Sequence, residues 1–131
     1  MRCDRCVLVA GALLGLSGII AGASLDHAAA KFVLQPHAAD TALRYHQLHA
    51  IIISALGLVL AFFPLDLKDR WRLAVSGEIL TLGTLIFCGS LYALAFTGTA
   101  YAAYGAPIGG VTLMSGWAAL IWAALRHRPS N

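Results

Sequence analysis

Residues 41–50 hold the side chains of this sequence best suited to chemistry, because they combine histidine, tyrosine and arginine ahead of a long apolar run. On a helix, Tyr45 and His49 are four residues apart and lie on one side, with His46 on the flank. Histidines at such a place invite metal or haem ligation. Two axial ligands of one haem must face each other from different helices, however, and His46 and His49 share one. We therefore expect hydrogen-bonded structural histidines in a polar cluster between helices, with no metal and no cofactor.

Glu78 is the one acidic side chain in the apolar run of residues 73–96. It would lie about 8–9 Å inside the membrane boundary, where a carboxylate costs roughly 3 kcal/mol. One interpretation gives Glu78 a role in proton relay or substrate binding. The alternative is a carboxylate that reaches back to Arg70 or Arg72, or a protonated carboxyl bonded to a neighbouring helix.

Cys3 and Cys6 form a C-x-x-C pair, a spacing found both in redox-active thiols and in half of a zinc site. The only other cysteine, Cys88, lies within a later apolar run, so a second pair is missing. We expect two reduced thiols on a cytoplasmic tail. The sequence also lacks the serine, zinc-binding and phosphate-binding motifs of common enzymes, which predicts that the protein is not an enzyme.

The composition is that of a membrane protein. Of the 131 residues, 60% are hydrophobic and only 11% are charged, whereas about 25% are charged in soluble proteins. The apolar residues fall into four runs, each long enough to cross a hydrocarbon core of about 30 Å as a helix. We predict an all-α integral membrane four-helix bundle with short loops, forming a single domain over residues 1–131. The spans are expected at residues 6–25, 41–63, 73–96 and 105–125.

The first loop, residues 26–40, is too polar to cross the membrane and is rich in alanine. We expect a short interfacial helix over residues 28–34. A second helix should begin near Pro36, since proline starts a helix readily but cannot continue one. This second helix would run as one rod to Phe63, about 42 Å long, and should either protrude from the lipid or tilt.

Glycines recur at helical spacing within the spans. In lipid, a strip of small residues lets a neighbouring helix approach closely, and packing drives the association. We therefore expect the strip in the first span to face another helix of the same bundle. The predicted packing glycines are Gly11, Gly15, Gly18 and Gly22 in the first span, Gly89 in the third, and Gly109 and Gly110 in the fourth.

The first span has an alternative interpretation as a cleaved signal peptide. Arg2 and Arg5 are typical of a positive n-region, and residues 21–23 of an A-x-A cleavage site. A signal peptide needs no packing face, however, so the glycine strip favours a retained helix. We expect the first helix to remain uncleaved.

Lysine and arginine predict the orientation in the membrane. Two lie in the N-terminal tail, three in the second loop and two in the C-terminal tail, whereas Lys31 and Arg44 lie at the opposite face. Because cytoplasmic segments are enriched in these residues, both termini are expected in the cytoplasm, with the chain in a bacterial inner membrane. The net charge of +3 fits this orientation. No basic patch with interleaved aromatics indicates nucleic acid.

Seven polar side chains should come to similar depths near the outer face, because the first helix ends, the second begins and the third ends there. Arg44 stays charged and offers five donors, so we expect it to bind Asp26, with Asp40 as competitor, or helix-terminal carbonyls. His49 is expected to bond to the first or third helix. The candidate binding cluster is Asp26, His27, Arg44, Tyr45, His49, Ser90 and Tyr92.

Four motifs carry a resemblance to a known family: RYHQLHA, FCGSLYALAFTG, APIGGVTLMSGW and GALLGLSGIIAGA. They resemble the small bacterial four-helix membrane proteins called domain of unknown function 423, which are similar to mitochondrial transmembrane-protein-256-like proteins. The similarity runs from residue 11 to about residue 122 and implies a retained first helix, but no activity. Cys88 stands where the family is expected to have serine, and Glu78 where it is usually apolar, which weakens Glu78 as a functional residue.

These features favour a non-enzymatic helix bundle that acts as an accessory or assembly component. It would lie in the lipid bilayer and pack as a homo-oligomer or within a larger membrane complex, as the glycine faces indicate. The polar cluster and Glu78 support an alternative, a small oligomeric transporter or channel. A haem- or quinone-binding redox component is a further alternative, supported only by the histidines.

Overall fold

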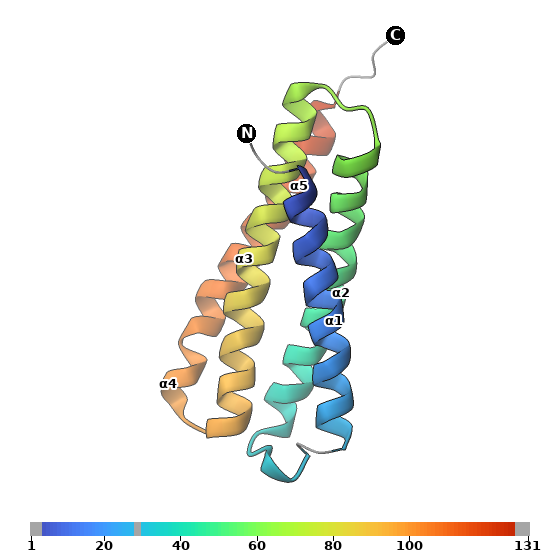
Figure 1. Ribbon diagram of the computed structural model, residues 1–131. Coiled ribbons are helices and arrows are strands. Elements are labelled where there is room, and N and C mark those ends of the chain that lie inside the picture. Colours follow the sequence, from blue (N-terminus) through green and yellow to red (C-terminus); the bar gives the residue numbers. More distant parts are fainter. Residues whose placement is uncertain (1–3, 28–29, 128–131) are drawn as a thin grey trace.

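The structure, a computed structural model, describes residues 4–27 and 30–127 and confirms the predicted four-helix membrane architecture. Its four long helices are long and apolar enough to cross a membrane. The start of the first, the turn between the second and third, and the end of the last lie at one end of the bundle (Figure 1). The elements are α1 (Asp4–Asp26), η1 (Ala30–Phe32), α2 (Pro36–Phe62), α3 (Leu67–Thr97), α4 (Ala100–Ala103) and α5 (Gly105–Arg126).

Helices that follow one another in sequence also pack against one another in space. α1 packs along α2, α2 along α3 and α3 along α5, while α1 reaches α3 over a shorter stretch. The pairs α1/α2 and α3/α5 are visible as two hairpins in Figure 1. The buried apolar side chains of the core are Val7, Leu14, Ala50, Ile53, Leu60, Ala74, Leu80 and Leu113.

Helix α2 begins at Pro36, as predicted, because proline in the first turn removes no hydrogen bond that the helix needs. Its 27 residues span about 40 Å. The interfacial helix expected before it is shorter than predicted, a single 3₁₀ turn at Ala30–Phe32, and residues 28 and 29 lie outside the described residues. The amides of Leu34 and Gln35 donate to the Ala95 carbonyl at 2.8 and 3.1 Å, which ties this loop to the last turn of α3.

Helix α3 begins at Leu67, before the apolar run that predicts a span from residue 73. Asp66 caps it, since its carboxylate accepts the Asp69 amide at 2.6 Å. Lys68, Arg70 and Arg72 are good helix formers and Asp69 lies in the first turn, where an acidic residue is favourable, so the helix extends through a stretch that hydropathy alone excludes. At about 1.5 Å per residue, 31 residues span about 46 Å. The charged first turns of α3 therefore project beyond a hydrocarbon core of about 30 Å.

Three glycines of the predicted strip on α1 do face α2. A Cβ on Gly11 would collide with the backbone and side chain of Ser54. A Cβ on Gly18 would lie 3.5 Å from the Gln47 side chain, and one on Gly22 would touch the same side chain. These glycines let α1 and α2 approach closely, as expected of small residues between membrane helices.

Gly15 and Gly89 were expected to pack within the bundle, and this prediction is wrong. A Cβ at either position would meet nothing within 4 Å. At about 100° per residue, Gly15 lies about 40° around the helix from Gly11, whereas Gly18 and Gly22 lie within about 20° of it. Gly15 therefore sits at the edge of the strip and opens outward.

The α3/α5 hairpin is interlocked in the same way. Gly109 packs directly on the Phe87 backbone, so that a Cβ would overlap it, while a Cβ on the neighbouring Gly110 would lie 3.9 Å from the Phe87 ring. The contact that matches it in the α1/α2 hairpin comes from Gly57, which packs on the backbone of Leu8. Gly57 was not among the predicted packing residues, because it stands alone in an apolar run and forms no glycine repeat.

Candidate functional site

His49 is the most enclosed polar residue of the predicted cluster, with 2% of its surface exposed. Its Nδ1 lies 2.8 Å from the Tyr45 carbonyl oxygen, which can only accept, so Nδ1 must donate. The indole Nε1 of Trp117, which can only donate, lies 3.4 Å from His49 Nε2. These two partners define a neutral imidazole that is protonated on Nδ1.

His46 lies about 60° around α2 from His49, on the flank that faces α1 and α3, and has the opposite tautomer. Ser17 Oγ donates to the Leu14 carbonyl at 3.1 Å, so it accepts from His46 Nε2 at 3.2 Å. His46 Nδ1 is then free to accept from the Tyr92 hydroxyl at 3.3 Å. His46 is buried, with 7% of its surface exposed, so these bonds take the place of water.

The two histidines together connect α2 with every other long helix. His46 bonds to α1 through Ser17 and to α3 through Tyr92, and His49 bonds to α5 through Trp117. Within the described residues, no buried side-chain nitrogen or oxygen lacks a partner. The cluster is therefore a complete hydrogen-bonded network within the membrane-spanning part.

Tyr45 covers His49 on the lipid side. The two rings are stacked, with centroids 6.0 Å apart and planes 12° from parallel. The Tyr45 ring also lies 5.0 Å from that of Phe87 on α3. With Trp117 these rings line an open, largely apolar pocket of about 330 Å³ between α2, α3 and α5. The pocket offers aromatic faces to an apolar molecule, while the His49 nitrogens beneath it are already bonded.

The predicted cluster is thus found in part. Tyr45, His49 and Tyr92 lie in the network, but the expected bond from His49 to the first or third helix is wrong, since its partner is on α5. His46 makes those bonds instead. Ser90 lies elsewhere: its hydroxyl donates to the Ile86 carbonyl of its own helix at 2.7 Å, and its side chain packs against the start of α5.

The expected pairing of Arg44 is also wrong. Arg44, Asp26 and His27 are all exposed, and in the part of the chain that the structure describes Arg44 forms no ion pair with Asp26 or Asp40. Arg44 lies about 100° around α2 from Tyr45, so it points away from the side chains that bond to other helices. In the N-terminal part of α2, an exposed guanidinium can also reach water and keep its hydration.

His46 was expected to be a hydrogen-bonded structural histidine but was left out of the candidate binding cluster, and Ser17 and Trp117 were missed altogether. Ser17 adjoins Gly18, and Gly18 faces α2, so a serine beside the strip was a usable signal. No pattern in the sequence indicates that Trp117 contacts His49. The two residues lie on α5 and α2, which are not consecutive helices, so adjacency along the chain does not predict their contact.

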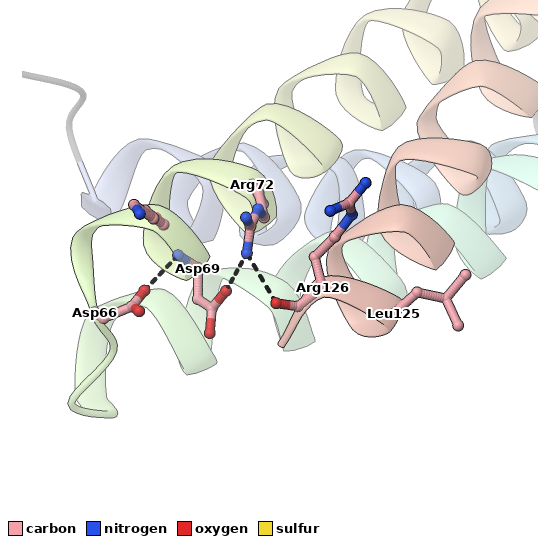
Figure 2. A pocket seen from close by; sticks show the side chains of 6 residues that line it. Asp66, Asp69, Arg72, Leu125 and Arg126 are labelled. Atoms are coloured by element: carbon pink, nitrogen blue, oxygen red, sulfur yellow. Dashed lines mark hydrogen bonds and ion pairs between the residues drawn. The ribbon is translucent and has the colours of Figure 1, made fainter. Parts of the chain in front are cut away.

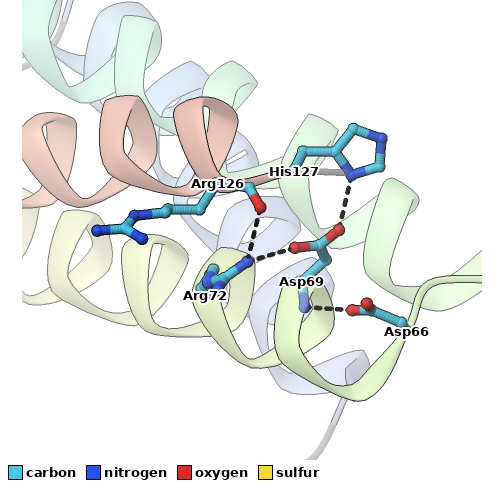
Figure 3. A network of polar contacts seen from close by, with 5 residues as sticks. All are labelled: Asp66, Asp69, Arg72, Arg126 and His127. Atoms are coloured by element: carbon cyan, nitrogen blue, oxygen red, sulfur yellow. Dashed lines mark hydrogen bonds and ion pairs between the residues drawn. The ribbon is translucent and has the colours of Figure 1, made fainter. Parts of the chain in front are cut away.

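A second polar network lies at the opposite end of the bundle, where α3 begins and α5 ends. Asp69 is its centre: one carboxylate oxygen lies 2.8 Å from Arg72 Nη1 and the other 2.6 Å from His127 Nδ1 (Figure 3). Arg72 also donates to the Arg126 carbonyl at 3.2 Å and lies over the Trp122 ring, 5.1 Å from its centroid. The network ties the last turn of α5 to the first turns of α3.

Arg70 adds the end of α2 to this arrangement, since its Nη1 donates to the Leu60 carbonyl at 2.8 Å. Beside Asp69 and Arg72 lies an open pocket of about 600 Å³ between α3 and α5 (Figure 2). Leu125 is its one apolar lining residue, and the rest of the lining is charged. The charged turn of residues 64–72 was predicted, but not its role in holding three helices together.

Glu78 is exposed on the side of α3 that faces α1, where it lines a groove with Cys6 and Val7. Cys6 belongs to the first turn of α1, so Glu78 lies level with the start of that helix. This depth agrees better with a carboxyl near the membrane surface than with one in a relay. Of the cysteines, Cys6 is exposed and Cys88 buried, while Cys3 lies outside the described residues.

Comparison with known proteins places these features in a family. Residues 21–110 match the model of a family described as protein of unknown function, DUF423. The chain is 32% identical over 126 residues to the UPF0382 inner membrane protein YgdD of Escherichia coli K12, covering 94% of this chain and 92% of the relative. A UPF0382 membrane protein of Schizosaccharomyces pombe is 30% identical over 118 residues, or 84% and 93% of the two chains.

A UPF0382 membrane protein of Haemophilus influenzae is 33% identical over 89 residues, which cover 68% of this chain and 67% of the relative. No solved structure matches significantly. The relatives are named as membrane proteins, and the four apolar helices of the structure agree with that name. The chain therefore belongs to the DUF423 family of polytopic membrane proteins, whose function is unknown.

Proposed function

We propose that the protein is a non-enzymatic helix bundle of the inner membrane that acts as an accessory or assembly component, packing with copies of itself or with other subunits. The observation that carries this proposal is the state of the two histidines. All four ring nitrogens of His46 and His49 are used in hydrogen bonds, and three of these bonds join α2 to another helix.

A histidine that binds a metal, holds a haem or moves a proton needs a ring nitrogen available to its ligand. Here, ligation at His49 Nε2 would displace Trp117, and ligation at His46 would separate α2 from Ser17 or Tyr92. Each such step would cost a contact between helices. This supports a structural role for the histidines over the redox alternative.

The transporter alternative drew on Glu78 as an acid within the membrane. Its position level with Cys6, in the first turn of α1, brings it close to the end of the bundle that holds the Asp69 network. An acid near the surface does not supply a relay step at mid-membrane. This supports an assembly role over transport.

The orientation that goes with this role has both termini in the cytoplasm and the first helix retained. Seven Lys and Arg residues lie at the two ends of the sequence and in the first turns of α3, against Lys31 and Arg44 at the other end of the bundle. A C-terminal reporter should therefore be active as a cytoplasmic fusion and inactive as a periplasmic one. An intact mass that begins at Ser24 would contradict the retained helix.

The assembly role is tested by purifying the tagged protein from its own membranes in a mild detergent. Blue-native electrophoresis with mass spectrometry should show a species larger than one chain, with a defined stoichiometry. A visible spectrum of the same sample should show no haem band. A similarly tagged four-span protein from the same membrane controls for adventitious partners. A purely monomeric species, or a haem band that scales with protein concentration, would contradict the proposal.

A further inference from the structure

An open groove of about 570 Å³ runs along the surface between α1 and α2 and is lined by these two helices alone. Its floor consists of small residues, among them the buried Gly11 and Ala50 and the half-buried Gly15. Large aliphatic side chains form its rim: Ile19 is 69% exposed, Ile51 70% and Leu58 47%. Small residues flanked by large ones form the shape that receives a ridge of another membrane helix.

Gly15 shows that this chain does not fill the groove itself. A Cβ there would meet nothing within 4 Å, whereas one on Gly11, a turn earlier, would collide with Ser54. The same glycine strip thus serves two contacts. Gly11 is used within the chain, and Gly15 leaves space beside it on the outer surface.

Gln47 provides a second, polar observation at the same surface. It lines the groove, and its side chain lies across α1 above Gly18 and Gly22, with Nε2 3.7 Å from where a Cβ on Gly22 would be. It follows His46 directly, so its amide lies in the membrane-spanning part of α2. Among the described residues none forms a hydrogen bond with the Gln47 side chain. An amide with two donors and two lone pairs is costly to leave unbonded in lipid.

We infer that the α1/α2 groove is the contact surface for a second copy of this chain, in which the two Gln47 amides bond to each other. The inference rests on the proposed assembly role and names the partner. Two copies inserted with the same orientation are related by a two-fold axis along the membrane normal. Each residue on that axis then meets its own counterpart at equal depth.

A carboxamide is self-complementary, because it donates and accepts at once, so two Gln47 side chains at equal depth satisfy each other. An acyl chain could fill the apolar part of the groove, but it would leave the amide without a partner. The floor around Gly15 lets the α1 backbones approach closely enough for the amides to meet.

The test measures self-association of the purified full-length protein in phospholipid vesicles. Two samples labelled with donor and acceptor dyes are mixed, and energy transfer is followed as the protein is diluted in lipid. The wild type is expected to form dimers. Gln47→Leu should raise the dimer dissociation constant by about tenfold through loss of the paired amides, and Gly15→Leu should abolish the dimer by filling the groove.

Gly89→Leu is the matched control. Gly89 also has nothing within 4 Å of its Cβ position, but it lies on α3 and takes no part in the groove. This variant should associate like the wild type, and the helix content and thermal unfolding of all variants should show that each is folded. If Gly15→Leu does not fold, Gln47→Leu alone decides.

Several results would overturn the inference. The inference is refuted if the wild type stays monomeric at high density in lipid. It is also refuted if both groove variants leave the dimer intact, or if Gly89→Leu weakens the dimer as much as the groove variants do. A monomer that nevertheless purifies with other subunits would refute self-association through this groove while leaving the proposed assembly role in place. A monomer that purifies alone would refute both.

Discussion

Replacing Tyr92 with phenylalanine removes one hydroxyl and leaves the ring that packs edge-on against His46. The lost bond is the one from the Tyr92 hydroxyl to His46 Nδ1, at 3.3 Å. This bond is the polar link that His46 makes between the α1/α2 hairpin and α3. The variant therefore isolates one interhelical hydrogen bond with little change in shape.

The expected magnitude follows from the geometry and from the membrane setting. Hydrogen bonds between membrane helices contribute about 0.6 kcal/mol on average and up to about 1.7 kcal/mol. A length of 3.3 Å points to the weaker part of that range, but the buried Nδ1 is left without a donor, which adds to the cost. We expect Tyr92→Phe to reduce the free energy of unfolding by about 1 kcal/mol. His46→Ala, which loses both bonds and its ring contacts, should cost about 2–4 kcal/mol.

The assay is reversible unfolding in mixed micelles with increasing dodecyl sulfate, followed by circular dichroism and tryptophan fluorescence. A double-mutant cycle with Tyr92→Phe and His46→Ala separates the bond from other effects of each change. The coupling energy should be close to 1 kcal/mol. Ser90→Ala is a suitable control, because the Ser90 hydroxyl bonds within its own helix. A coupling energy near zero, with Ser90→Ala as damaging as Tyr92→Phe, would refute the assignment of these bonds.

Two further predictions concern packing and the charged end of the bundle. Gly109→Ala should reduce stability by about 1–3 kcal/mol in the same unfolding assay, since its Cβ would overlap the Phe87 backbone. Gly110→Ala should be tolerated, because its Cβ would lie at an ordinary contact distance of 3.9 Å, and equal effects at both glycines would contradict the packing. Asp69→Asn should lower the thermal unfolding midpoint and make the end of α5 more accessible to protease, because the contacts with Arg72 and His127 lose their charge. Unchanged protease sensitivity would show that this network does not hold α5.

The sequence predicted the four helices well because apolar length is a strong signal, and it located the start of α2 because Pro36 has few other places in a helix. The predicted third span was too short at its start. The apolar run begins only at residue 73, after the charged residues, whereas the helix is capped by Asp66 and already includes those charged residues. Helix boundaries in polar segments follow from capping and helix propensity, which hydropathy does not contain.

The candidate site was predicted less completely, for a geometrical reason. The spacing of Tyr45 and His49 correctly put both on one side of α2. Spacing along one helix does not say which neighbour lies on which side, however, so His49 was expected to face the first or third helix when it faces α5. Spacing also could not show that Gly15 lies at the edge of its strip, because that depends on how α1 crosses α2.

The pairing of consecutive helices has a consequence for how the chain is made. Both α1/α2 and α3/α5 are interlocked by glycines that sit directly on a partner's backbone, at Gly57 and Gly109. Each hairpin can therefore close soon after its second helix leaves the insertion machinery, before the rest of the chain is synthesised. The bonds from His46 to Tyr92 and from His49 to Trp117 reach across from the first hairpin to the second, so the former needs α3 and the latter must await α5, the last helix. During biosynthesis, these two bonds would therefore form late, when the α1/α2 and α3/α5 hairpins pack against each other.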